Sequence, residues 1–284
     1  MIKKRVLAIF CSSVFLPLAF VFCPVRSTVA DEAIITADSM RYDPDTGNVT
    51  ATGNVHLIGA DGEAFGDSGL GSVSGDNFEL HGSVKGYFNT KNGKTVDIVC
   101  ESASLRGDVG GRVITLSGKV KITRGAETLT ADEAAWNTEI EKYSAHGNVL
   151  GVFEGYSIDA DAVSRDVSVF EAEAVRKFSE RARKIDMSAS RAEGLLNENN
   201  EITELTADGD VIVTMPDRQG VITRATGRKG IYSMARGTVV LSGRAVVTQS
   251  GRVLSSENIV YFIDSGRIDA RGNPSLTFET DRGK

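Results

Sequence analysis

Apolar and polar residues alternate strictly along short runs of this chain. In Val49-Thr-Ala51-Thr-Gly53-Asn-Val55-His-Leu57 every second residue is apolar or glycine, and the residues between them are polar. Strict alternation of this kind predicts a β-strand with one face toward a core and the other toward solvent. We therefore expect the apolar members of the run to point into the interior of a sheet.

The run returns along the chain as a repeat of the form apolar-x-small-x-Gly-x-apolar. The glycines that mark it are separated by 29, 36, 29, 62, 34 and 29 residues, and the longest interval holds a degenerate copy at 170–174. This spacing gives about eight units of roughly 31 residues, which is the period of a repeat architecture. The repeat glycines are Gly53, Gly82, Gly118, Gly147, Gly209, Gly243 and Gly272.

Each unit begins with a second pattern, of which 35–42 (ITADSMRY) is an example. Apolar residues occupy alternate positions up to Ala37, but the next one, Met40, follows three residues later in place of two. This shift of one residue predicts a β-bulge that turns the strand. A turn sequence at 43–48 (DPDTGN) then leads into the next run, so neighbouring strands are expected to form antiparallel hairpins, on the order of sixteen strands in all. Cys100 occupies the small position of its copy, and we interpret it as a buried structural thiol.

The alternation places every repeat glycine in the inward row, where it contributes no side chain. A glycine inside a strand weakens it, so a compensating role is expected. It either lets the sheet bend or admits a close backbone, or it leaves a trough for a ligand along the inner face, and the two interpretations are compatible. The inward residues predicted to line such a groove are Ile35, Ala37, Val49, Val55, Leu57, Ile114, Leu116, Val120, Val149, Leu205, Val211, Val213 and Leu241.

The first thirty residues form a separate segment. Lys3, Lys4 and Arg5 precede twenty uncharged residues, and small residues follow at Thr28 and Ala30. This is the pattern of a secretory signal peptide at 1–30, with a retained membrane anchor as the alternative. An exported protein is therefore expected.

Composition and charge narrow the function further. The chain is 41% hydrophobic and 25% charged, as in an ordinary folded protein. Removing the basic leader shifts the net charge from −6 to −10, which disfavours nucleic acid or an anionic membrane surface as a partner. Cys11 and Cys23 leave with the leader, so Cys100 has no disulfide partner.

The sequence contains little that indicates a catalytic or metal-binding site. The sequence lacks the phosphate-binding, nucleophile-elbow and zinc-protease motifs. Its histidines, His56, His81 and His146, lie in different repeats, and its carboxylates recur at repeat positions as a structural role predicts. We expect no catalytic residue, no metal site and no cofactor.

The sequence leaves the secondary structure of one segment undecided. Residues 171–200 are highly charged and fit either a helix or a charged strand pair. The basic cluster at 176–184 would meet lipid phosphates or form a solvated face.

The paired motif A-D-x-x-x-Y/W and A-x-G-N/D-V resembles the OstA-like family, the LptA family of periplasmic lipopolysaccharide-transport bridge proteins. The closest matches are TAD at 36–38 with ATGNV at 51–55, and TAD at 130–132 with AHGNV at 145–149. The resemblance covers 34–276. It implies an all-β fold, an elongated antiparallel β-jellyroll or β-taco of about eight two-strand repeats, open along one side and at both ends.

The resemblance also implies a function. The inner face would carry acyl chains, and protomers would join end to end through their terminal strands. About eight units are roughly twice what one bridge protomer holds, so the OstA-like domain at 31–284 forms either one long groove or two tandem halves, 31–165 and 166–284.

The expected role is a non-enzymatic periplasmic carrier or bridge for lipopolysaccharide-like glycolipid between the inner and outer membranes. Its partners would be that glycolipid and other OstA-like envelope transport proteins. A structural or adhesive β-repeat protein with a filled core is the alternative, and a glycan-active enzyme is a third class.

Overall fold

The computed structural model describes residues 33–278 except 61, 74–76, 91–92, 109–110, 138–139, 141, 167, 199–200 and 218. These residues belong to one compact unit, Glu32–Lys284. The expected leader at 1–30 lies outside the described residues. Within the described part, no helix is long and apolar enough to cross a membrane.

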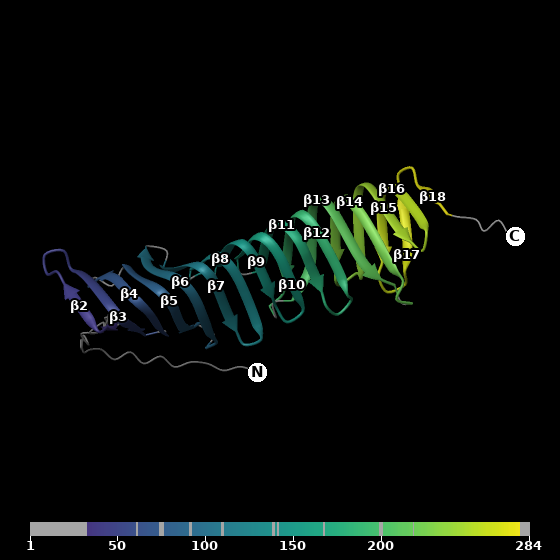
Figure 1. Cartoon of the computed structure of the whole chain (residues 1–284). Coiled ribbons are helices and arrows are strands. Elements are labelled where there is room, and N and C mark those ends of the chain that lie inside the picture. The colour runs from purple at the N-terminus through teal and green to yellow at the C-terminus, as the bar shows by residue number, and fades with distance from the viewer. Residues whose placement is uncertain are drawn as a thin grey trace, which may run out of the picture. The chain divides into compact units, whose positions relative to one another are not determined.

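The described residues form eighteen β-strands in one sheet (Figure 1). Their bounds are β1 (Ile34–Thr36), β2 (Ser39–Tyr42), β3 (Asn48–Gly59), β4 (Gly62–Ser72), β5 (Asn77–Asn89), β6 (Thr95–Asp108), β7 (Gly111–Arg124), β8 (Glu127–Asn137), β9 (Lys142–Val152), β10 (Tyr156–Asp166), β11 (Val169–Glu180), β12 (Ile185–Leu196), β13 (Ile202–Pro216), β14 (Ile222–Ser233), β15 (Thr238–Gln249), β16 (Arg252–Phe262), β17 (Arg267–Arg271) and β18 (Ser275–Thr277).

The sheet is an antiparallel meander. Each strand from β4 to β15 pairs with the strand before it and the strand after it. β1 and β2 both pair with β3, and β17 and β18 both pair with β16, so each of these pairs is one strand broken by a kink. Counted this way, the described residues hold sixteen strands, and the all-β antiparallel prediction is confirmed. Of the charged segment 171–200, residues 171–180 and 185–196 belong to the strand pair β11 and β12.

A line of β-bulges crosses the sheet at the repeat position. Between β7 and β8, for example, the pairing shifts between Ser117 and Val120, so two residues of β7 oppose one of β8. In β9 the two bulged residues, Gly147 and Asn148, have left-handed φ values of 73° and 50°. The bulge predicted from the phase slip is confirmed, but its extra residue lies in the glycine-bearing strand.

The repeat glycines do not point into the interior, which corrects the inward placement inferred from the alternation. A Cβ built on Gly147 would lie 2.8 Å from Cγ of Asp132, an exposed side chain of the preceding strand. Exposed residues cover the other repeat glycines in the same way, as Asp38 does at Gly53. Alternation assumes an extended backbone, and two consecutive left-handed residues interrupt it. The glycine therefore admits a neighbouring side chain on the outer face.

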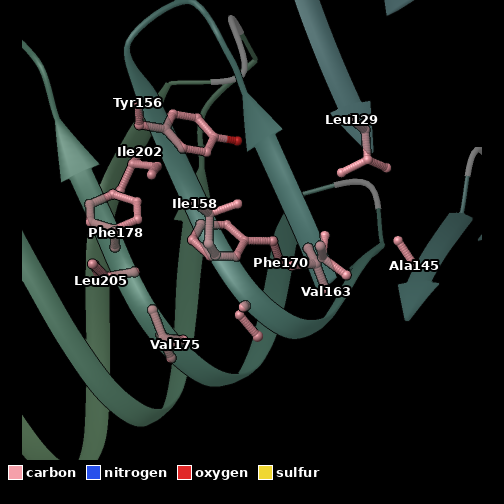
Figure 2. Close-up of a cluster of buried hydrophobic side chains, with 14 of the residues drawn as sticks. Leu129, Ala145, Tyr156, Ile158, Val163, Phe170, Val175, Phe178, Ile202 and Leu205 are labelled. Carbon is pink, nitrogen blue, oxygen red and sulfur yellow. The ribbon is translucent and has the colours of Figure 1, made fainter. Parts of the chain in front are cut away.

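The apolar rows of the strands join in one continuous core. Val55, Ala145, Val149 and Leu241 are fully buried in it, although they come from strands far apart in the sheet. Figure 2 shows neighbouring strands curving around such side chains. Cys100 is a free, buried thiol in this core, as predicted.

Candidate functional site

A cavity of about 560 Å³ lies inside the middle of the sheet, among residues of β5 to β12 and their connecting turns. Its walls are apolar and include Val96, Ile98, Leu116, Ile122 and Leu129. These side chains come from the inward rows of β6, β7 and β8, which the strict alternation directs to one face.

The cavity is lined from both edges of the sheet, and we call the strand ends and turns that line it at these edges its mouth. Successive strands run in opposite directions, so the turns β5–β6, β7–β8 and β9–β10 follow one edge and the turns between them follow the other. Lys94, Arg124 and Phe153 line the cavity from the first edge. Arg165 and Leu196 line it from the second edge, so the folded sheet brings its two edges together across the opening.

Charge is confined to this mouth. The Arg124 guanidinium donates two hydrogen bonds to Oε2 of Glu127, from Nε at 2.9 Å and from a terminal nitrogen at 2.6 Å. Burial raises the pKa of Tyr143, and the nearby Arg165 only partly opposes that shift. The phenol therefore stays neutral at physiological pH, and the cavity combines an uncharged wall with a charged rim.

One polar group inside the site has no partner. The indole Nε1 of Trp136 is buried and finds no hydrogen-bond partner among the residues that the structure describes, and the ring lies edge-on to Phe88 with 4.6 Å between the centroids. Both residues line the cavity. An unsatisfied buried donor costs about 1–3 kcal/mol, which an acceptor carried by a ligand would recover.

The predicted groove residues are buried in the core, packed against it or in the wall of a cavity, and their role in lining a lipid groove stays a prediction. Ile114 and Leu116 line the large cavity. Leu205 and Val213 line a second cavity of only about 10 Å³. The remaining residues are buried in the core or packed against it: Ile35, Ala37, Val49, Val55, Leu57, Val120, Val149, Val211 and Leu241.

Sequence reasoning missed the residues that shape the mouth. The missed residues stand at strand ends or in turns, outside the repeated centre of the alternation: Phe88, Arg124, Trp136, Phe153 and Arg165. A usable signal was present, because aromatic and basic residues are concentrated at those strand ends in this part of the chain.

The second half of the sheet is filled by large side chains. Tyr261, Phe178 and Met215 are at most 1% exposed. The ladder passes from β10 to β11 through nine paired positions, so the sheet is continuous where the two tandem halves were expected to meet. The division into two halves stays a prediction.

The basic cluster at 176–184 is bonded within the protein. Arg176 pairs with Asp159, 2.7 Å from Nε to Oδ1, and also with Asp161. Arg183 donates to the Tyr232 hydroxyl at 3.0 Å. These bonds tie β11 to β10 and the turn after β11 to β14.

A bulged antiparallel meander whose edges meet over an apolar cavity defines a class of β-sheet proteins with an internal groove. The chain belongs to the family described as LptA/(LptD N-terminal domain) LPS transport protein, whose model matches residues 100–267, more than half of the chain. The family resemblance drawn from the motifs is therefore confirmed.

One solved structure with a similar chain is LptH, the LptA homologous periplasmic component of the lipopolysaccharide transport device from Pseudomonas aeruginosa. The two sequences are 17% identical, the match covers 54% of this chain and 95% of LptH, and the TM-score is 0.32. No curated protein matches the sequence.

Proposed function

We propose that this protein is a non-enzymatic periplasmic carrier or bridge for lipopolysaccharide-like glycolipid between the inner and outer membranes. The observation that carries the proposal is the apolar cavity with a charged mouth, in a chain that belongs to a lipopolysaccharide-transport family.

The cavity suits an acyl chain attached to a polar head. Each methylene removed from water contributes about 0.8 kcal/mol, so an apolar wall without specific side-chain chemistry is sufficient for affinity. The unpartnered Trp136 Nε1 is placed to donate to an ester or amide carbonyl at the start of such a chain. Lys94, Arg124 and Glu127 at the mouth would face the charged head group.

Binding of purified lipopolysaccharide to the full chain tests this proposal. Ile114→Trp fills the cavity with a larger ring and is expected to reduce binding strongly. Val253→Trp is the matched control, because Val253 is an exposed apolar strand residue outside the cavity. Equal binding by both variants, or none by the wild type, would contradict the proposal.

The adhesive alternative makes a different prediction in the same assay. The filled second half of the sheet is the observation that favours it. A structural protein with a packed core would bind no lipopolysaccharide, either as the wild type or as a variant. The stability of its Ile114→Trp variant would be unchanged only if the cavity had room for the indole ring.

End-to-end strand pairing with a second copy, or with another OstA-like protein, is the proposed mode of assembly. Among the described residues, only β3 pairs with β1 and β2, and only β16 pairs with β17 and β18. Both outer edges therefore present backbone groups to a further strand. Exposed apolar side chains stand on them, including Met40, Tyr42 and Leu276.

We propose that the register of the repeat also applies to that contact. In β3–β4 the residue before the repeat glycine, Thr52, pairs with the residue after the acid, Ser68, and the same relation holds in β5–β6 and β7–β8. If the last strand of one copy pairs with the first strand of the next copy in the same register, Arg271 of the first copy lies opposite Ser39 of the second.

The same register places Leu276 opposite Ile35. Ile35→Cys with Leu276→Cys is expected to give intermolecular products with a short thiol crosslinker. Ile34→Cys with Leu276→Cys is the control, because a shift of one residue turns the side chain to the opposite face. Equal crosslinking by the two pairs would contradict the register.

The export route has its own test. The leader at 1–30 is proposed to direct the chain to the periplasm, where it is either cleaved or retained as an anchor. N-terminal sequencing of the protein recovered from the periplasmic and membrane fractions distinguishes these outcomes, and a cytoplasmic location would contradict both.

A further inference from the structure

The interior of the sheet divides into an open part and a filled part. The cavity of about 560 Å³ ends near β10 to β12, and the small cavity beyond it measures about 10 Å³. The alternation of apolar residues is the same on both sides of this boundary. The alternation alone therefore does not explain why the interior is open on one side and filled on the other, and particular side chains must close the large cavity.

Four aromatic rings stand at the boundary. Phe153 stacks on Tyr156 with 4.7 Å between centroids, and Tyr156 lies 6.1 Å from Phe170 and 5.8 Å from Phe178. We call these four residues the aromatic plug. Phe153 lines the cavity, and the other three are at most 7% exposed.

Figure 2 shows where the plug lies. The rings of Tyr156, Phe170 and Phe178 project from β10 and β11 into the interior. Leu129, a cavity residue, lies on one side of Tyr156 and Phe170, and Leu205 lies on their other side, beside Phe178. Phe178 and Leu205 both line the small cavity. Phe153 lines the large cavity and Phe178 lines the small one, so the stack of Phe153, Tyr156 and Phe178 stands between the two spaces.

Two glycines provide the space that the plug occupies. A Cβ on Gly194 would overlap the Phe170 ring, 2.6 Å from Cδ1 and closer still to Cε1. A Cβ on Gly151 would lie 2.6 Å from Cε2 of Phe153. Real side chains do not approach so closely, so the close ring packing itself requires glycine at both positions.

We infer that the aromatic plug closes the cavity on the side that faces the small cavity. Acyl chains are then held in one blind compartment across β5 to β12, and they enter and leave laterally through the mouth lined by Lys94, Arg124 and Arg165. The filled strands beyond the plug support the sheet and its terminal edge without contacting the ligand. This inference rests on the proposed function.

Photolabelling of the full wild-type chain tests the inference without any substitution. The probe is a sixteen-carbon fatty acid that carries a diazirine near its methyl end, and labelled residues are mapped by mass spectrometry. Label is expected on cavity residues such as Ile98, Leu116 and Leu129, with none on Leu205 or Val213. Label on both sides of the plug overturns the inference, whereas no label in the interior contradicts the proposed function instead.

Opening the plug gives the second measurement. Phe153→Ala combined with Phe170→Ala is expected to extend the label to Leu205. Phe78→Ala is the control, since Phe78 is a ring of similar burial in β5, outside the plug. Circular dichroism shows which variants are folded. If the Phe153→Ala, Phe170→Ala double variant does not fold, the single variant Tyr156→Leu is used in its place. Label that stays confined to the cavity in a folded variant overturns the role of these rings.

Discussion

Alanine at a repeat glycine should destabilise the protein by more than its backbone conformation alone requires. Gly147 has a φ of +73°, and a Cβ there would meet Asp132 at 2.8 Å from both Cβ and Cγ. The carboxylate can rotate away, but Cβ of Asp132 is fixed to its own strand. Gly147→Ala must therefore displace the neighbouring strand as well as strain its own backbone.

The magnitude follows from these contacts. A left-handed alanine costs about 1–2 kcal/mol relative to glycine. Moving Asp132 breaks the hydrogen bond that Nδ2 of Asn148 donates to its Oδ2 at 2.9 Å, which is worth about 1 kcal/mol. An off-rotamer side chain adds about 1 kcal/mol. We expect Gly147→Ala to lower the free energy of unfolding by about 3 kcal/mol.

Gly251 is the matched control, because its φ is +74° and nothing lies within 4 Å of the built Cβ. Gly251→Ala should cost only the backbone part, about 1–2 kcal/mol. Urea unfolding followed by far-ultraviolet circular dichroism measures both variants, with the slopes compared to ensure that the same surface is exposed.

A second substitution isolates the contact. Asp132→Gly removes the atoms that obstruct the alanine, so the double variant should lose less stability than the two single changes predict together. Equal losses for Gly147→Ala and Gly251→Ala, or strict additivity with Asp132→Gly, would refute the outward packing of the repeat glycines.

Three further predictions concern buried and titrating groups. Gly194→Ala should lower the thermal midpoint through its overlap with Phe170, and Phe170→Leu should recover part of the loss; additive losses would contradict this contact. Burial raises the pKa of the Cys100 thiol to about 11, so the stability that this thiol contributes should be complete below its unfolded pKa near 9 and fall as the pH rises toward 11. That dependence should be absent in Cys100→Ala, and native protein should resist a thiol reagent at neutral pH. A hydrogen bond with His56 lowers the pKa of Glu63, so its contribution should be present above the unfolded pKa and decrease on acidification, and Glu63→Gln should weaken the acid dependence of the unfolding midpoint.

Much of the fold follows from local pattern. The alternation at 49–57 and its returns predict strands because side chains leave a pleated backbone on alternate faces. Short turns between them predict antiparallel pairing, and the acid-to-glycine spacing marks the bulge line. Even Cys100 could be placed in the core from its position in the repeat. These predictions used only the local sequence pattern and required no knowledge of contacts between residues far apart in the sequence.

The orientation of the repeat glycines could not be obtained in the same way. Counting by twos puts Gly53 in the inward row with Val49 and Val55, but a left-handed pair at Gly53 and Asn54 reverses the local direction. That conformation is favourable here because Asp38, from the neighbouring strand, covers the glycine and accepts a hydrogen bond from Asn54 at 2.8 Å. The deciding partner lies fifteen residues earlier than the glycine along the sequence.

The sequence by itself therefore determined the strands, their antiparallel order, the position of the bulges and the family. Only the tertiary structure decided which stretch of the inner face is open. Leu116 and Leu241 each stand two residues before a repeat glycine, yet Leu116 lines the large cavity and Leu241 lies in the filled core. The physical reason is that free volume depends on the combined size of side chains that converge from several strands, and Tyr156, Phe170 and Phe178 converge on one side only.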